Sequence, residues 1–256
     1  MAGINPLTSA LYSNNYLLGT QQKKQQPSAT DFLSSSTEIS ANLKSLLASH
    51  EDAKNAFYTE LGENMDALAA SADTIKNYNF HVAKEGAITK TNTTDEDGNI
   101  TTTTTYSKDL QAALDTVKDF VNDYNSSIRF FKDNASVSKR VENMASIFGD
   151  TTYRATNYEA IGLTVNSDGS LSINEDKLVN SILESPDKVS RTLGKDGLAG
   201  KAEEHIAFAE SQADKLFPTA EAMFGDQISA ASLYTGKAYR NMAAYANMGN
   251  LLNMMF

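Results

Sequence analysis

The chain contains no cysteine and no tryptophan, and only four prolines and three histidines, among its 256 residues. Without cysteine it can form neither a disulfide nor a thiolate nucleophile or metal site, and this absence suits either side of a membrane. No second histidine or carboxylate cluster lies at ligand spacing from His205. We therefore expect His50, His81 and His205 to be surface or packed residues, and we expect neither a bound metal nor a cofactor.

Basic residues are also scarce. The chain has 22 Lys and Arg against 32 Asp and Glu, which gives a formal net charge of −10. Nucleic acids and anionic lipid headgroups attract proteins mainly through Lys and Arg, so we expect neither nucleic acid nor a membrane as a partner. No stretch approaches the ~20 apolar residues of a membrane span, and the N-terminus lacks the features of a cleaved secretory signal.

Recognisable catalytic motifs are missing as well. The sequence has no Gly-rich phosphate loop, no His-carboxylate cluster and no Ser-His or Lys nucleophile arrangement, and its acidic residues are scattered as solvated faces. Hydrophobic residues make up 41% and charged residues 21% of the chain, which is ordinary for a soluble protein with one or two domains. We expect a protein that works by contact and not as an enzyme.

The clearest pattern is a run of apolar residues at alternating steps of four and three, here called the 110–131 seam. It consists of Leu110, Leu114, Val117, Val121, Tyr124, Ile128 and Phe131. The spacing places all of them on one face of a helix expected over 108–133. Burial of each side chain is worth about 1.5 to 3 kcal/mol before entropy, so this helix needs partner helices. The same spacing continues to Phe148, with Gly149 as a C-cap.

Two further long helices are expected towards the chain ends. The first covers about 38–77, and an inserted step of four after Phe57 is a stutter that locally unwinds a supercoil. The second opens at Pro218 and keeps the four-and-three spacing to the terminus. Its end, 241–256, has four Met and no charged residue, which suits either a buried bundle end or a self-association surface. The candidate contact residues there are Met242, Tyr245, Leu252 and Phe256.

Two small β-hairpins are expected between the helices. In 79–107, threonine-rich stretches flank an acidic turn at 95–99 that lacks the ligand spacing of a calcium-binding loop. Because these strands are polar on both sides, their register is weakly specified. In 160–174, apolar and polar residues alternate around a turn at 166–170. Asn174 and Pro186 then begin short helices.

These patterns together predict a mainly α fold, an elongated coiled-coil-like helical bundle with two small β-hairpin insertions. Residues 1–36 have few charges and are rich in Ser, Thr, Asn and Gln, so we expect this segment to be disordered. Residues 37–78 and 108–256 are expected to form the helical domain, which carries the 160–174 hairpin. The 79–107 hairpin is inserted into that domain.

Five short motifs follow one another in the second half of the chain. They are Val121-Asn-Asp-Tyr-Asn125, Ile161-Gly-Leu-Thr-Val165 with Asp168-Gly-Ser-Leu171, Asn174-Glu-Asp-Lys-Leu178, Ser185-Pro-Asp-Lys-Val189 and Gly197-Leu-Ala199. In order and spacing they resemble the C-terminal region of the flagellar hook-associated protein 2 family, the filament-capping proteins. The first motif is similar to the Val-x-x-Tyr-Asn signature of that family. The resemblance covers residues 110–256.

This resemblance implies a structural axial protein of the bacterial flagellum, located outside the cell. Such a protein travels unfolded through the type III export channel and assembles as a ring at the filament tip, where it guides flagellin into place. The implied partners are other copies of the chain, flagellin or other flagellar axial proteins, and a type III export chaperone. Residues 1–36 would then be an uncleaved export signal.

Other interpretations stay open at the level of sequence. The 79–107 hairpin stands where the family has large β-rich domains. One alternative is therefore an accessory flagellar assembly protein that has neither capping activity nor an adhesion role. A cytoplasmic helical scaffold or regulator is another, and a small-molecule-binding or peptide-binding bundle is a third. The number of subunits is not encoded in any motif.

Overall fold

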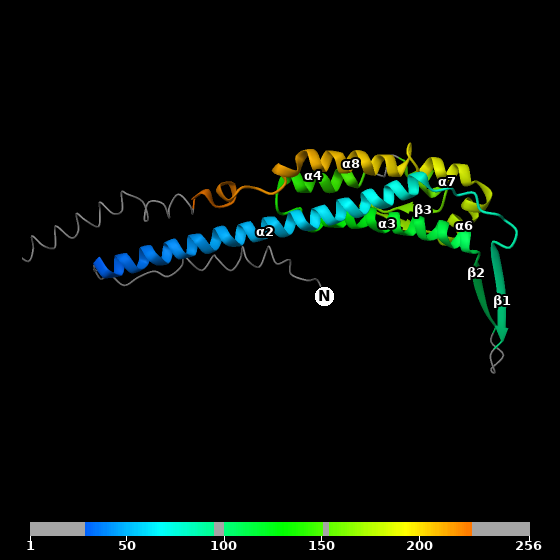
Figure 1. Cartoon of the computed structure of the whole chain (residues 1–256), viewed down its shortest axis with the longest axis horizontal. Coiled ribbons are helices and arrows are strands. Elements are labelled where there is room, and N and C mark those ends of the chain that lie inside the picture. Colours follow the sequence, from blue (N-terminus) through cyan, green and yellow to red (C-terminus); the bar gives the residue numbers. More distant parts are fainter. Residues whose placement is uncertain (1–28, 95–99, 151–153, 227–256) are drawn as a thin grey trace, which may run out of the picture. The chain divides into compact units, whose positions relative to one another are not determined.

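The computed structural model describes residues 29–94, 100–150 and 154–226. Within these ranges the protein is mainly helical, with seven α-helices and two antiparallel two-stranded sheets (Figure 1). The expectation of a mainly α fold with two small hairpins is therefore confirmed. The chain divides into two compact units, one formed by Met1–Tyr58 with Pro218–Phe256 and the other by Thr59–Phe217.

The first long helix, α2 (Ala29–Asn77), begins earlier than expected. Residues 29–36 are helical although they belong to the segment expected to be disordered, and residues 1–28 lie outside the described ranges. Adding a residue to an existing helix costs far less than starting one, so a polar stretch can extend a helix that its own composition would not nucleate. Sequence composition alone does not reveal this extension.

In the first unit, α2 meets the beginning of the last helix. His50 is buried, its Nε2 lies 3.0 Å from the carbonyl oxygen of Pro218, and its ring stands edge-on to that of Phe224, with centroids 6.1 Å apart. Residues 220–226 are helical, as expected after Pro218. The remainder of the helix expected from the sequence lies outside the described residues, and with it the candidate contact residues Met242, Tyr245, Leu252 and Phe256.

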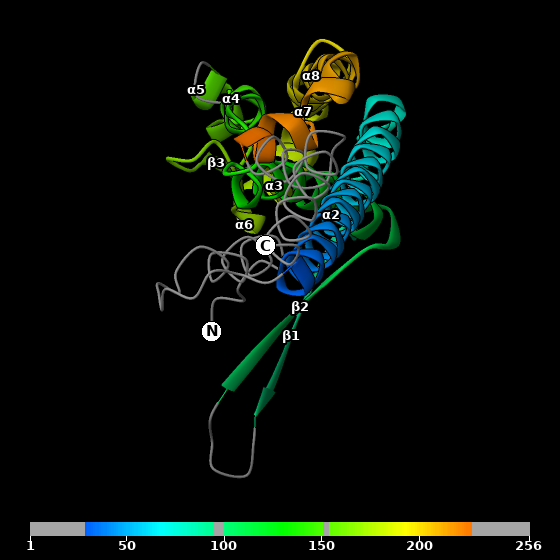
Figure 2. The ribbon, with the colours of Figure 1, turned by 90° about the vertical axis from the view of Figure 1, so that its left-hand side faces the viewer.

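The second unit contains the remaining helices. They are α3 (Lys108–Asp133), α4 (Lys139–Phe148), α5 (Ala155–Glu159), α6 (Glu175–Glu184), α7 (Pro186–Leu193) and α8 (Leu198–Gln212), followed by a 3-10 turn at Ala213–Lys215. α3 packs against α4 and α6, and α4 packs against α8 (Figures 1 and 2). The side chains of Ser107, Ser138 and Asn174 cap the first turns of α3, α4 and α6. The predicted N-cap at Asn174 is thus confirmed.

α3 buries a wider face than the 110–131 seam. All seven seam residues are buried, and so are Ala113, Phe120, Ser127 and Phe130. Three of these additional positions repeat every seven residues beside the seam. A narrow seam is typical of a two-stranded coiled coil, whereas a third buried position per heptad is typical of a helix packed on more than one side. α3 is accordingly the central helix of its unit.

The part of α2 in the second unit also follows the expected pattern. The residues that continue the four-and-three spacing after the stutter are all buried, namely Leu61, Met65, Leu68, Ala72 and Ile75. Near its end, the Nζ of Lys76 lies 2.5 Å from a carboxylate oxygen of Glu203 on α8. The helix is thereby held both by apolar packing and by an ion pair, of which the packing carries more free energy because the pair faces solvent.

The first hairpin consists of β1 (Ile88–Thr94) and β2 (Ile100–Tyr106), paired from Ile88 opposite Tyr106 to Thr94 opposite Ile100. It projects away from the helices of its unit in both ribbon views (Figures 1 and 2). All residues of β2 except Tyr106 are exposed. An isolated two-stranded hairpin is marginally stable in water, so the strands depend on their pairing with each other.

The second hairpin consists of β3 (Leu163–Val165) and β4 (Leu171–Ile173) and lies against the helices. Its turn contains Gly169, which has φ +84°, a value that side chains disfavour. A Cβ at this position would lie 2.2 Å from the carbonyl oxygen of Gly149, the C-cap of α4. The turn can therefore approach the end of α4 only because residue 169 has no side chain.

This close approach predicts different costs for two glycine substitutions. Gly86 has a similar φ of +72°, but nothing lies within 4 Å of a Cβ there. We expect Gly86→Ala to lower the free energy of unfolding by about 1–2 kcal/mol through backbone strain alone. Gly169→Ala should add about 1–3 kcal/mol for overpacking against Gly149. Urea unfolding measures both values, and equal losses in the two variants would contradict the packing of the turn on α4.

Candidate functional site

Residues of two of the resemblance motifs, 121–125 and 161–171, meet on the C-terminal half of α3. We call this region the hairpin junction and define it by Tyr124, Asn125, Lys132 and Asp168. Three of these residues come from α3 and one from the turn between β3 and β4. Through them α3 contacts both the end of α4 and the second hairpin.

Tyr124 connects α3 to α4. Its side chain is only 1% exposed, and its hydroxyl donates a hydrogen bond to the carbonyl oxygen of Phe148, the last residue of α4. Burial raises the pKa of Tyr124 well above its ordinary value, and nearby Tyr158 and Asp150 add to this shift. The hydroxyl therefore stays protonated and remains a donor, so a carbonyl at a helix end that lacks an intrahelical partner is satisfied.

Asn125, the next residue, holds the edge of β4. Its Nδ2 donates to the carbonyl oxygen of Leu171, and its Oδ1 accepts from the backbone N–H of the same residue, both at 2.8 Å. Within the hairpin, Asn166 N donates to the carbonyl oxygen of Ser170. Because bonded and non-bonded pairs alternate in antiparallel strands, the next residue, Leu171, presents its backbone groups outward. Asn125 occupies this free edge as a neighbouring strand would.

An ion pair fixes the turn of the same hairpin to α3. The Nζ of Lys132 lies 2.8 Å from the Oδ2 of Asp168 and donates to the backbone carbonyl of the same residue at 3.2 Å. The Oδ1 of Asp168 accepts from the backbone N–H and the hydroxyl of Ser170. The hydrogen bond from Lys132, followed by those from Ser170, lowers the pKa of Asp168 well below its ordinary value. The carboxylate is thus ionised at neutral pH.

In the hairpin junction, the polar side-chain groups bind other segments of the chain. The hydroxyl of Tyr124 and both amide atoms of Asn125 are engaged with backbone groups. The carboxylate of Asp168 is engaged with Lys132 and Ser170. An arrangement whose polar atoms are all paired with each other positions chain segments, and it leaves no free acid, base or nucleophile.

The sequence identified part of this region. The burial expected for the 110–131 seam is observed at every position, Tyr124 included. The Lys132–Asp168 pair was not anticipated. Its only signal in the sequence is a lysine in the last turn of a helix and an aspartate before a turn glycine, separated by 36 residues.

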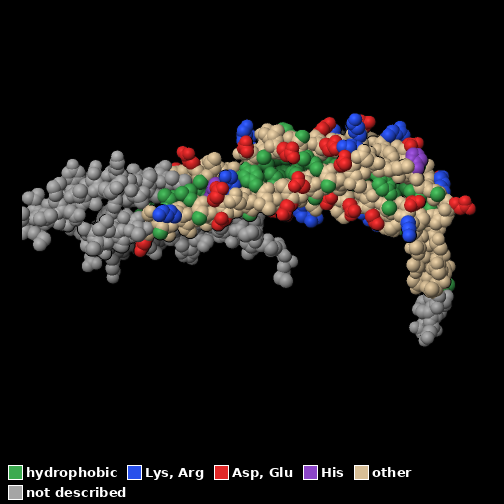
Figure 3. All heavy atoms as spheres, in the orientation of Figure 1, with side chains coloured by type: hydrophobic (Ala, Val, Ile, Leu, Met, Phe, Trp, Pro, Cys, Tyr) green, Lys and Arg blue, Asp and Glu red, His purple; other side chains and the backbone are tan. Residues whose placement is uncertain are grey.

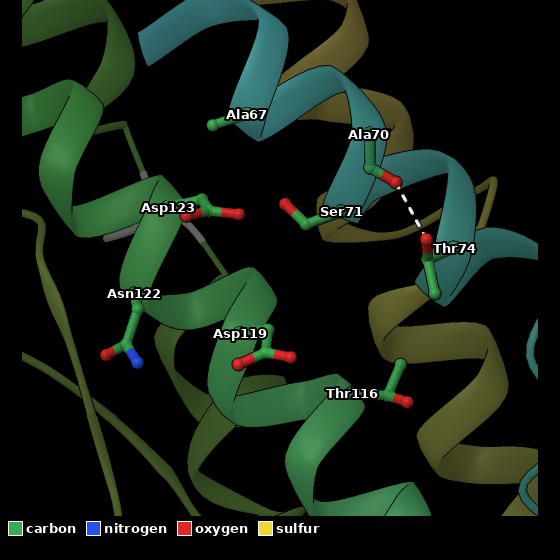
Figure 4. Close-up of a pocket in the computed structure, with 8 residues that line it drawn as sticks. All are labelled: Ala67, Ala70, Ser71, Thr74, Thr116, Asp119, Asn122 and Asp123. Atoms are coloured by element: carbon green, nitrogen blue, oxygen red, sulfur yellow. Dashed lines mark hydrogen bonds between the residues drawn. The ribbon is translucent and has the colours of Figure 1, made fainter. Parts of the chain in front are cut away.

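A groove lies between α2 and α3 on another side of the unit (Figure 4). Its volume is about 510 Å³, and it is lined by Ala67, Ala70, Ser71 and Thr74 of α2 and by Thr116, Asp119, Asn122 and Asp123 of α3. Small side chains of α2 face polar and acidic ones of α3. The charged side chains of the lining are the two carboxylates, Asp119 and Asp123, both from α3.

The three histidines occupy different surroundings. His81 is exposed, and its Nε2 lies 3.4 Å from a carboxylate oxygen of Asp187. His205 on α8 packs its ring against Phe148 with centroids 5.3 Å apart, and its buried Nδ1 has no hydrogen-bond partner. Burial, with a smaller contribution from Lys201, lowers the pKa of His205, so it is neutral at pH 7. No group of three metal-ligating side chains occurs in the ranges described.

Comparison of the chain with protein-family models, with curated proteins and with solved structures gave no match. Among the residues for which the structure is described, no helix is both long enough and apolar enough to cross a bilayer. The family resemblance therefore rests on the five sequence motifs alone.

The double hydrogen bond of Asn125 predicts a local and a global effect of its removal. Asn125→Ala leaves both backbone groups of Leu171 without that partner, so we expect a loss of about 1–3 kcal/mol in the free energy of unfolding. Amide hydrogen exchange at Leu171 should accelerate. Asn122→Ala, on an exposed position of the same helix, is the matched control and should change neither quantity. Unchanged protection of Leu171 in Asn125→Ala would contradict the capping role.

The Lys132–Asp168 pair predicts a dependence of stability on acid pH. The folded-state pKa of Asp168 lies below the unfolded value of about 3.9, so its stabilisation is present above that pH and is lost as the pH falls through the folded pKa. The Asp168 side chain is 47% exposed, so solvent screening keeps the effect small. Urea midpoints of wild type and Asp168→Asn should differ at pH 6, and the difference should shrink as the pH is lowered to 2.5. Lys132→Gln should show the same decrease in the difference, and a constant difference would refute the pair.

Proposed function

We propose that the protein is a structural axial component of the bacterial flagellum, resembling the filament cap formed by hook-associated protein 2. In this proposal it assembles with copies of itself and with flagellin at the filament tip. It acts outside the cell after type III export, with an export chaperone as a further partner. It performs no chemical step.

The observation that carries the proposal is that three of the five resemblance motifs contact one another. Tyr124 and Asn125 from the first motif contact Phe148 and Leu171, and Asp168 from the hairpin returns to α3. In the third motif, the backbone N–H of Asn174 donates to the carbonyl oxygen of Gly162. Motifs that are separated in sequence but support one another in space form a single structural unit, which favours a shared family origin over a chance match of short strings.

The physical properties of the chain are compatible with this role. Export in an unfolded state requires a fold without covalent cross-links, and the chain has no cysteine. The polar groups of the hairpin junction are engaged in structure, which favours a protein that works through its surface. We further propose that the helical seams pair lengthwise in an elongated coiled-coil-like bundle. Within it, the charge-free 241–256 segment would engage neighbouring subunits through Met242, Tyr245, Leu252 and Phe256.

A strain that lacks the gene tests the proposal. A missing cap releases unpolymerised flagellin into the medium, so we expect a clear rise in secreted monomeric flagellin that the wild-type gene reverses. Antibodies should detect the protein in sheared filament fractions of the wild type. Presence in filaments without flagellin release would favour the accessory assembly role, and presence only in the cytosol would refute the axial role in favour of a scaffold or regulator.

A further inference from the structure

The outer edge of β2 has unpaired backbone groups in a regular pattern. Ser107 N donates to the carbonyl oxygen of Ala87 at 2.8 Å, immediately beyond the last pair of the hairpin. Since bonded pairs alternate along antiparallel strands, Thr101, Thr103 and Thr105 direct their backbone groups towards β1. The residues between them direct theirs away from it, so β2 offers an edge to which another strand can pair.

This edge lacks the devices by which proteins protect a free strand. Natural sheets block their edges with lysine, proline, bulges or a covering segment. β1 carries Lys90 on its own edge, and β4 is covered by Asn125. β2 reads Ile-Thr-Thr-Thr-Thr-Thr-Tyr and contains neither a charge nor a proline. On the face shown in Figure 3, the described part of the hairpin consists almost entirely of backbone and of side chains that are neither charged nor hydrophobic.

The sequence of β2 is complementary to itself. Thr103 is the middle residue of the strand, with two threonines on each side and then Ile100 at one end and Tyr106 at the other. In an antiparallel arrangement about Thr103, every threonine meets a threonine, whose hydroxyl both donates and accepts. Ile100 meets Tyr106, a favourable aliphatic–aromatic cross-strand pair. Ile100 is 69% exposed in the single chain, and this contact would cover it.

We propose that β2 pairs in antiparallel fashion with β2 of a second copy of the chain, about a two-fold axis through Thr103. The two hairpins then form one four-stranded sheet. In this register the outward backbone groups of Thr102 meet those of Thr104 of the second copy, and Thr103 faces its own equivalent in a non-bonded pair. The inference deepens the proposed self-assembly, on which it rests for its biological setting, by naming the strand that joins two subunits.

Charge also favours this direction of pairing. The residues that connect β1 to β2 include Asp95, Glu96 and Asp97. Antiparallel pairing sends the connections of the two copies to opposite ends of the joint sheet, whereas parallel pairing would bring them together. Since like charges repel across short distances, antiparallel pairing avoids the repulsion between the two connections that parallel pairing would create. The partner is thus a second copy of the chain, with a symmetric interface.

Cysteine cross-linking tests the register directly, because the chain has no cysteine of its own. Residues of a non-bonded antiparallel pair have Cα atoms about 4.5 Å apart, which is within the range for a disulfide. Purified full-length Thr103→Cys should form a disulfide-linked dimer under mild oxidation. Thr91→Cys is the matched control, because Thr91 is paired with Thr103, is equally exposed and lies on β1. Equal cross-linking of the two variants, or none in Thr103→Cys, would overturn the proposal.

Proline substitution tests the edge itself without removing a backbone hydrogen bond of the hairpin. The side-chain hydrogen bond from Thr102 Oγ1 to Asn92 Oδ1 is lost equally in the two variants compared below. Thr102 and Asn92 are opposite each other in a pair whose backbone groups point outward. A proline is tolerated where its missing N–H faced solvent. Thr102→Pro should therefore raise the dimer dissociation constant at least about tenfold in sedimentation experiments. Asn92→Pro, on the edge of β1, should leave it unchanged, and equal effects would count against β2 as the interface.

The outcomes separate this inference from the proposed function. A Thr103→Cys protein that does not cross-link but is found in filament fractions would overturn the strand pairing and leave the flagellar role intact. A protein that cross-links through residue 103 but is confined to the cytosol would overturn the flagellar role and leave the strand pairing intact.

Discussion

The fold of the second unit depends on the two hydrogen bonds by which the Asn125 side chain pairs with the free edge of β4. A strand of three residues gains little from its single partner, and Leu171 would expose an unpaired N–H and C=O next to a packed core. Asn125 supplies both partners from a helix that is already buried on its apolar side. With Tyr124 on the end of α4, two neighbouring residues of α3 determine where a helix and a hairpin are placed.

The two hairpins differ in whether the free edge of the hairpin is covered. The β3–β4 pair is short, buried on one side and closed at its edge by an amide and an ion pair. The β1–β2 pair is longer, exposed on both faces and open at the edge of β2. Closing an edge stabilises a monomer, whereas leaving one open provides a place where another strand can add. The second hairpin, β3–β4, thus serves the interior of the unit, and the first hairpin, β1–β2, is available to a partner.

Features determined by local sequence were predictable, and those determined by distant contacts were not. The bounds of α3, the strands of the second hairpin and the cap at Asn174 follow from periodicity, turn composition and side chains within a few residues. The additional buried positions, such as Phe120 and Phe130, depend on how many neighbours surround α3, which one helix does not encode. The Lys132–Asp168 pair and the groove beside α2 likewise arise only when separate segments meet.

The separation in sequence of these contacts sets an order in which the unit can assemble. Tyr124 reaches Phe148 across 24 residues and Asn125 reaches Leu171 across 46, whereas Lys76 of α2 reaches Glu203 across 127. Closing the longest of these loops costs about 0.9 kcal/mol more entropy than closing the 46-residue one. The shorter loops favour a folding nucleus of α3, α4 and α6 with their hairpin, with α2 docking later. A chain that leaves a narrow channel end first could complete this nucleus before its two ends come together.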